Sequence, residues 1–107
     1  MAIVNVTDVE FTSEVLNHNG PVLIDFWAGW CNPCKRLAPE FEKLAEKFSG
    51  TIKFVKVDVD QSPVAAKSCN VMFFPTLVFF NPGATPVASS GFATAADLEK
   101  KFNLGGR

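Results

Sequence analysis

Two cysteines three positions apart are the residues of this sequence best suited to chemistry. Cys31 and Cys34 lie in the segment "WCNPCK", with Asn32 and Pro33 between them. Thiols at this spacing can bind a metal, form a structural disulfide or exchange electrons reversibly with the disulfide of another molecule. The choice among the three depends on what the rest of the chain places around the two thiols.

The two alternatives to a redox role lack supporting residues. A structural zinc site needs four ligands, and the remaining candidates, Cys69 and His18, stand alone and far apart in the sequence. We therefore expect no metal. Three cysteines are too few for a disulfide-stapled scaffold, and the N-terminal segment lacks the features of a secretory signal. An inert structural disulfide is thus less expected than a redox-active pair.

The position of the pair favours reversible redox chemistry. The apolar run "VLIDFWA" (22–28) predicts a buried strand before the pair, although Asp25 interrupts it, and a helical pattern follows. The first turn of a helix exposes unpaired N–H groups and the positive end of the helix dipole, which both stabilise a thiolate. Cys31 is nearer to that end. It is therefore the expected nucleophile, and Cys34 would resolve the mixed disulfide.

The elements around the pair predict an α/β fold. Thr7 or Asp8 could cap the first helix, and Pro86 predicts that the last strand lies at a sheet edge. Helices alternate with strands before a hairpin and a closing helix, which favours a mixed sheet with helices on both faces. Strands are expected at 3–6, 22–28, 51–60, 75–80 and 87–90, and helices at about 9–17, from the cysteines to 48, 62–68 and from Thr94 to Phe102.

Composition narrows the class of protein. The chain has 107 residues, of which 48% are hydrophobic and 20% charged, and this predicts one globular domain over 1–107. The net charge of −1, without a basic block, argues against a nucleic-acid partner. No apolar stretch is long enough to span a bilayer. We expect a soluble intracellular protein.

A longer segment, "VLIDFWAGWCNPCKRLAPEFEKLA", resembles the thioredoxin family, whose usual signature is Trp followed by Cys-Gly-Pro-Cys-Lys. The resemblance covers essentially the whole chain, since "VNVTDVEF", "VKVDVD", "FPTLVFF" and Gly91 follow in the family's order and spacing. It implies a thioredoxin fold, with a central mixed sheet of five strands flanked by four helices. Thioredoxins are themselves a standard example of reactive Cys-X-X-Cys chemistry.

The resemblance also implies a function. The chain would reduce protein disulfides by dithiol–disulfide exchange, without a cofactor of its own, and a separate thioredoxin-reductase-type donor would re-reduce it. Its partners would be disulfide-containing proteins, and it would act as a cytoplasmic monomer that binds neither nucleic acid nor membrane. Two alternatives use the same fold: a disulfide oxidase or isomerase working in reverse, and a binding module without turnover.

Family roles follow for the residues around the thiols. Cys31 would attack and Cys34 would resolve. Asp25 would accept the proton of Cys34, taken as the less exposed thiol, because a desolvated carboxylate has a raised affinity for protons. Lys56 would lie near that acid. The alternatives are a core carboxylate without function for Asp25 and a solvated strand lysine for Lys56.

A second set of family residues would bind the target. Pro75 would be a cis-proline facing the cysteines and would expose the backbone of Phe74 for pairing with an extended segment. Trp30 and Gly91 would border the same groove. Trp27 is expected to be a packing residue close to the site.

Three positions depart from the family pattern. Asn32 replaces the usual glycine and, with Pro33, should tune the reduction potential. Phe73 and Phe74 replace the usual small or polar residues before the expected cis-proline, where Phe73 either enlarges the groove as a target-binding residue or packs into the core. Cys69 is an extra thiol that is expected to be buried, with regulatory oxidation or dimerisation as alternatives.

Overall fold

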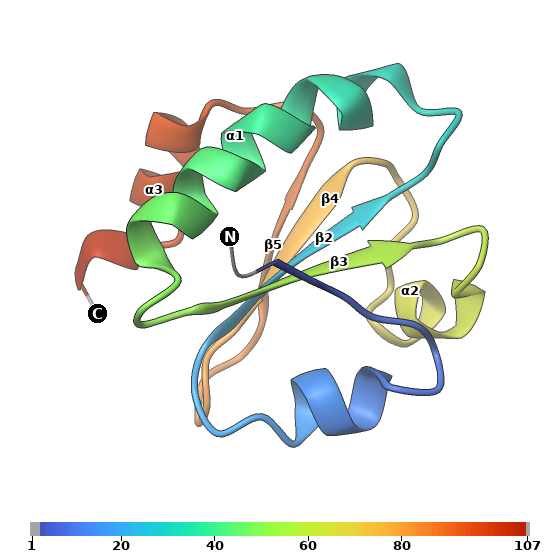
Figure 1. Cartoon of the computed structure of the whole chain (residues 1–107), viewed down its shortest axis with the longest axis horizontal. Helices are drawn as coiled ribbons and strands as arrows, with labels where there is room; N and C mark the ends of the chain where they lie inside the picture. The colour runs from blue at the N-terminus through green and yellow to red at the C-terminus, as the bar shows by residue number, and fades with distance from the viewer. Residues whose placement is uncertain (1–2, 107) are drawn as a thin grey trace.

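The computed structural model describes residues 3–106 and contains one five-stranded mixed sheet (Figure 1). The strands are β1 (Ile3–Asn5), β2 (Val22–Trp27), β3 (Lys53–Asp58), β4 (Thr76–Phe80) and β5 (Val87–Ser90). Their order is β1-β3-β2-β4-β5. β3 pairs in parallel with β1 and β2, whereas β4 is antiparallel to both β2 and β5. The predicted mixed sheet is confirmed, with β2 at its centre.

The helices cover both faces of the sheet. They are the π-helical turn η1 (Thr12–Leu16), α1 (Asn32–Phe48), α2 (Pro63–Ser68), α3 (Ala95–Lys101) and the short 3₁₀ turn η2 (Leu104–Gly106). Figure 1 shows α1 and α3 on one face, and α2 with the blue turn η1 on the other. Within residues 3–106, no helix has the length and apolar character needed to cross a membrane.

Each face of the sheet has its own hydrophobic core. Successive side chains of a strand point to opposite faces, so β2 contributes to both cores. Leu23 packs with Leu37 and Phe41 of α1, whereas Ile24 and Phe26 belong to the cluster on the other face. Burial on both faces explains why this strand is a nearly continuous apolar run.

Asp25 is the polar residue of this central strand. Residues two apart in a strand share a face, so Asp25 lies on the same face as Leu23, which packs against α1. The prediction of a buried acid within the strand is confirmed, since Asp25 has no exposed surface.

The first helix is shorter than predicted, and its cap is different. The helix expected over 9–17 is the single turn η1, and the predicted capping role of Thr7 or Asp8 is wrong. The backbone N–H and hydroxyl of Thr7 donate to the Glu10 carboxylate at 3.0 and 2.9 Å. The Asp8 carboxylate instead accepts the N–H groups of Val64 and Ala65, at 3.1 and 2.7 Å. A tertiary contact with α2 therefore replaces the local cap.

In the second half of the chain, the helices and the edge strand lie close to where the sequence predicts them. Pro63 occupies the start of α2, where its missing N–H costs nothing. β5 pairs with β4 alone and forms an edge of the sheet, as Pro86 predicts. Thr94 caps α3, because its hydroxyl accepts the N–H of Asp97 at 3.2 Å. The strand expected over 51–60 is shorter, since β3 occupies its centre.

Candidate active site

The cysteine pair lies where β2 gives way to α1. Cys31 is the N-cap residue of α1, and its Sγ accepts the backbone N–H of Cys34 at 3.2 Å. The two cysteines form a disulfide, with their Cα atoms 5.3 Å apart. Asn32 and Pro33 form the start of the helix, where the Asn32 N–H has no partner inside the helix and Pro33 has no N–H to leave unpaired. One helical turn thus holds both sulfurs, and Cys31 is the sulfur at the helix end.

The two cysteines are equally buried. Each has 4% of its surface exposed, so the expectation that Cys34 is the less exposed thiol is wrong for this disulfide-bonded state. Packing explains the result, because both residues belong to the same hydrophobic cluster. What distinguishes the two sulfurs is the hydrogen bond from the Cys34 N–H, which a thiolate at Cys31 would accept more strongly than a neutral thiol does.

The charges around the helix end favour a thiolate. The first turn of α1 contains no acidic residue, and the exposed Lys35 follows Cys34 directly. The positive end of the helix dipole adds to this charge. The local electrostatics therefore lower the free energy of an anion at Cys31.

Asp25 is a buried carboxyl group on the face that α1 covers. Neither of its carboxyl oxygens has a hydrogen-bond partner among the residues that the structure describes. Burial raises the pKa of Asp25 from 3.8 to about 7, and the positive charge of Lys56 opposes this rise. The two residues are register partners in the parallel β2–β3 pair. Asp25 can therefore gain and lose a proton near neutral pH.

A small cavity connects Lys56 with the cysteine pair. It has a volume of about 130 Å³, and Trp27, Cys34 and Lys56 lie in its wall. The Lys56 Nζ lies 5.2 Å from the ring centre of Trp27, a cation–π distance. Lys56 is half-buried, so it is not the fully solvated strand lysine of the alternative interpretation. Trp27 packs beside the site, as predicted.

The predicted target-binding residues gather around a cis peptide bond between Phe74 and Pro75. The Gly91 N–H donates to the Pro75 carbonyl at 2.8 Å. The Trp30 ring is 65% exposed and meets the Phe74 ring edge-on, with 5.9 Å between the ring centres. Since Trp30 directly precedes Cys31, these contacts bring all four residues to the same side of the molecule as the cysteine pair.

Two details of this region bear on target binding. In the described part of the chain, the backbone N–H and C=O of Phe74 have no hydrogen-bond partner. The Phe73 side chain is 70% exposed, so the alternative in which its ring packs into the core is wrong. Met72 beside it is also exposed. An unpaired peptide group and an apolar surface therefore lie side by side.

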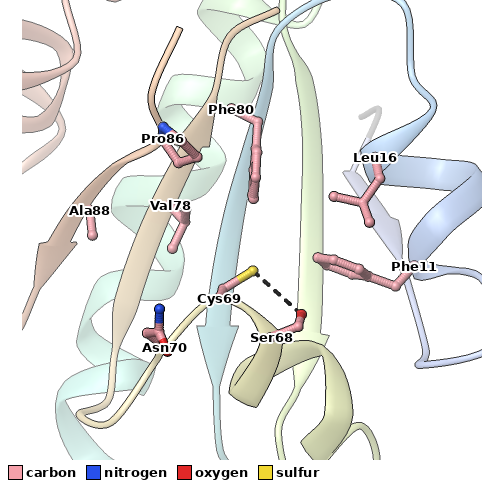
Figure 2. Close-up of a pocket in the computed structure, with 9 residues that line it drawn as sticks. All are labelled: Phe11, Leu16, Ser68, Cys69, Asn70, Val78, Phe80, Pro86 and Ala88. Atoms are coloured by element: carbon pink, nitrogen blue, oxygen red, sulfur yellow. Dashed lines mark hydrogen bonds between the residues drawn. The ribbon is translucent and has the colours of Figure 1, made fainter.

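Cys69 lies outside this group. Figure 2 shows it in a pocket of about 390 Å³, with Phe11, Val78 and Phe80 among the lining residues. Its thiol is half-buried rather than fully buried, and burial raises the pKa of this thiol. The Ser68 hydroxyl lies 3.9 Å from the Cys69 Sγ. Across residues 3–106, no three His, Cys, Asp or Glu side chains are grouped so that they could hold a metal ion.

One contact near the site could not be predicted from the sequence. The guanidinium carbon of Arg36 lies 4.4 Å from the ring centre of Phe92. These residues are far apart in the sequence and belong to no common motif. The only signals are positional, because Arg36 follows the "WCNPCK" segment and Phe92 follows Gly91.

Comparisons with known proteins agree with this arrangement. A sequence model of the Thioredoxin family matches residues 2–103. The thioredoxin of Pyropia yezoensis is 42% identical over 103 residues, 96% of each chain. A Staphylococcus aureus thioredoxin is 44% identical over 98 residues, 92% of each chain. The solved structure of a chloroplastic thioredoxin z has a TM-score of 0.85 at 28% identity, covering 96% of this chain and 93% of that one.

Proposed function

Because the chain belongs to the thioredoxin family and is a thiol–disulfide oxidoreductase, we propose that Cys31 is its attacking thiol and Cys34 its resolving thiol. The observation that carries this assignment is the hydrogen bond from the Cys34 N–H to the Cys31 Sγ at the start of α1. An N–H donor and a helix N-terminus stabilise negative charge on that sulfur. Cys31 is therefore the sulfur that reacts first.

The proposed cycle transfers two electrons to the target. The Cys31 thiolate attacks one sulfur of the target disulfide, and the other target sulfur leaves as a thiolate. The Cys34 thiolate then attacks the Cys31 Sγ, which breaks the mixed disulfide and releases the second target thiolate. The target is reduced to two thiols, and the protein is left with the Cys31–Cys34 disulfide.

Asp25 is the proposed proton acceptor for Cys34. The side chain lies on the sheet face that α1 covers, and Cys34 belongs to the buried side of α1. A carboxyl group whose pKa is about 7 can take the thiol proton before resolution and release it afterwards. Lys56 is proposed to hold this pKa near neutrality, because its charge favours the carboxylate form.

The proposed target-binding surface consists of Trp30, Phe73, Phe74, Pro75 and Gly91. An extended target segment would pair with the free peptide groups of Phe74, as in the addition of a strand. The exposed rings of Trp30 and Phe73 supply apolar contact beside that pairing, since Trp30 meets the Phe74 ring and Phe73 directly precedes it. For the neighbour thioredoxin z, a type-specific target recognition is described.

Asn32 and Pro33 are the proposed determinants of the reduction potential. Both occupy the helix start between the sulfurs, where they influence the thiolate and disulfide forms to different extents. The N–H groups at the start of α1 and the dipole of this helix act on the reduced form, in which Cys31 carries a negative charge.

Further proposals concern the setting of the reaction. The chain would form one domain over residues 1–107 and act as a cytoplasmic monomer in electron transport from a thioredoxin-reductase-type donor to disulfide-containing proteins. The family match over residues 2–103 supports a single domain. The net charge of −1 supports a protein that binds neither nucleic acid nor an anionic membrane surface.

Two single variants test the assignment of the cysteines. Pre-reduced wild type should reduce a model protein disulfide, and Cys31→Ser should not. Cys34→Ser should instead accumulate a mixed disulfide through Cys31, visible as a covalent adduct by mass spectrometry. An adduct that forms at Cys34 in the Cys31→Ser variant, at the wild-type rate, would reverse the assignment.

A further inference from the structure

We propose that Arg36 and Phe92 form a recognition site for an acidic side chain of the target, close to the target cysteine that Cys31 attacks. This inference rests on the proposed function, because it concerns which disulfides the same active site prefers. The ligand is the carboxylate of an Asp or Glu in the target polypeptide. The site would add a charged contact to the apolar surface of Trp30 and Phe73.

The Phe92 ring holds the Arg36 guanidinium in place. The guanidinium carbon lies 4.4 Å from the ring centre, within the range of a cation–π contact. Both side chains remain accessible, and 38% of Phe92 is exposed. The N–H groups of a guanidinium point outward in its own plane, so those that do not face the ring can donate to a ligand.

Two hydrogen bonds place this pair beside the active site. The Gly91 N–H donates to the Pro75 carbonyl at 2.8 Å, so Phe92 directly follows a residue fixed to the cis-proline. The Ala95 N–H donates to the Glu40 Oε1 of α1, also at 2.8 Å. The segment between Gly91 and Ala95 is therefore held at both ends, against the cis-proline and against α1.

Arg36 itself comes from the same helix end as the cysteine pair. It lies two residues after Cys34, just beyond the first turn of α1. A target segment that pairs with Phe74 and presents its sulfur to Cys31 passes this end of the helix. Arg36 is thus within the region that the target must approach.

The charge of Arg36 is not neutralised within the described residues. Arg36 has no ion pair or hydrogen bond there. Glu40, one turn further along α1, would be its natural partner, since residues four apart share a helix face. The Glu40 carboxylate is engaged elsewhere, by the Lys43 Nζ at 3.0 Å and by the Ala95 N–H. A carboxylate from outside can therefore take the free side of the guanidinium through two parallel N–H donors.

Two synthetic peptides test the proposal. Each contains one intramolecular disulfide, and they differ only in Glu against Gln at the positions flanking the cysteines. Pre-reduced wild type should reduce the Glu peptide about two- to fivefold faster at low ionic strength, the range expected for one exposed ion pair. Arg36→Gln should bring this ratio of second-order rate constants close to one. Because both peptides meet the same Cys31, the ratio cancels any change in thiol reactivity.

Three further variants sharpen the test. Phe92→Leu keeps the charge but removes the ring, and it should lower the ratio. Arg36→Lys should give an intermediate ratio, because an ammonium lacks the planar fork. Lys100→Gln changes the net charge equally at an exposed position of α3 and should keep the wild-type ratio.

The outcomes separate this inference from the proposed function. A wild-type ratio of one, an unchanged ratio in Arg36→Gln, or an equal loss in Lys100→Gln would overturn the recognition site. Failure of wild type to reduce either peptide would instead overturn the proposed function. If Arg36→Gln does not fold, as judged by near-ultraviolet circular dichroism, the ratios of Phe92→Leu and Arg36→Lys decide the question.

Discussion

Asp25 lies opposite Lys56 in the parallel β2–β3 pair, and neither oxygen of the Asp25 carboxyl has a hydrogen-bond partner among residues 3–106. Burial raises the pKa of Asp25 to about 7, while the charge of Lys56 acts in the opposite direction. A buried carboxylate without donors is costly, because desolvation penalises the charged form. The same environment that makes Asp25 a useful proton acceptor therefore reduces the stability of the fold.

The first prediction concerns this cost. The pKa of Asp25 is higher in the folded chain, at about 7, than its ordinary value of 3.8, so the folded state binds more protons between these values. The stability contributed by the protonated group is present at low pH and is lost as the pH rises through 7. Asp25→Asn should therefore raise the free energy of unfolding at pH 8, by at most about 4 kcal/mol.

Denaturant unfolding of the oxidised protein at pH 8 and at pH 4 measures this effect. The gain from Asp25→Asn should shrink toward zero at pH 4, where the wild-type carboxyl is mostly protonated in the folded chain. Asp60→Asn is the matched control, because Asp60 is exposed. A gain that is equal at both pH values would show that ionisation of Asp25 is not its cause.

A second prediction concerns the resolving step. In wild type, the rate at which the mixed disulfide decays should rise with pH around 7, and Asp25→Asn should remove this dependence. Lys56→Met should move the inflection to higher pH, because the charge of Lys56 lowers the pKa of Asp25. Rapid quenching with acid, followed by mass spectrometry, measures the decay. An inflection that moves to lower pH in Lys56→Met would contradict the assigned role of Lys56.

A third prediction follows from the contact between Asp8 and α2. The Asp8 carboxylate accepts two N–H groups at the start of this six-residue helix, whose own N-cap residue Ser62 makes no side-chain cap. Asp8→Ala should lower the free energy of unfolding by about 1 to 2 kcal/mol. Amide hydrogen exchange should accelerate in α2 first. Asp60→Ala serves as the control, and unchanged exchange at Val64 and Ala65 would refute the capping role.

A fourth prediction concerns the exposed ring of Phe73. Phe73→Ser should change the free energy of unfolding by less than about 0.5 kcal/mol, because the ring is 70% exposed. It should slow the reduction of a protein disulfide but not that of a small disulfide reagent, which does not extend over the ring. Val9→Ser is the matched control, since Val9 is 93% exposed and lies outside the site. Equal slowing with both substrates would argue against a role in target binding.

The sequence predicted the framework of the site because its signals are local. The apolar run of β2 and the helical pattern after it place Cys31 at a helix start, whatever the rest of the chain does. An acid within a strand buried on both faces must itself be buried, which located Asp25. The hairpin and the closing helix carried equally local signals in Pro86 and Thr94.

The features that the sequence could not predict depend on contacts between distant segments. The Asp8 carboxylate has its partners in α2, so no local rule for caps could identify them. The Arg36–Phe92 contact likewise joins α1 to the segment after β5. Whether the Phe73 ring is exposed depends on the space that other elements leave around it, and the hydrophobic pattern of the sequence does not predict that space.

The active site is assembled from residues in both halves of the chain. The cysteine pair follows β2 in the first half, whereas the cis-proline and Gly91 border β4 and β5 in the second, with the exposed Met72 before them. A fragment that ends near Met72 would retain both thiols and Trp30 but lose Phe74, the cis-proline and Gly91, which complete the surface that receives a target. Mixing it with the complementary fragment would restore turnover only when β4 pairs again with β2, so that disulfide reduction reports reassembly of the sheet.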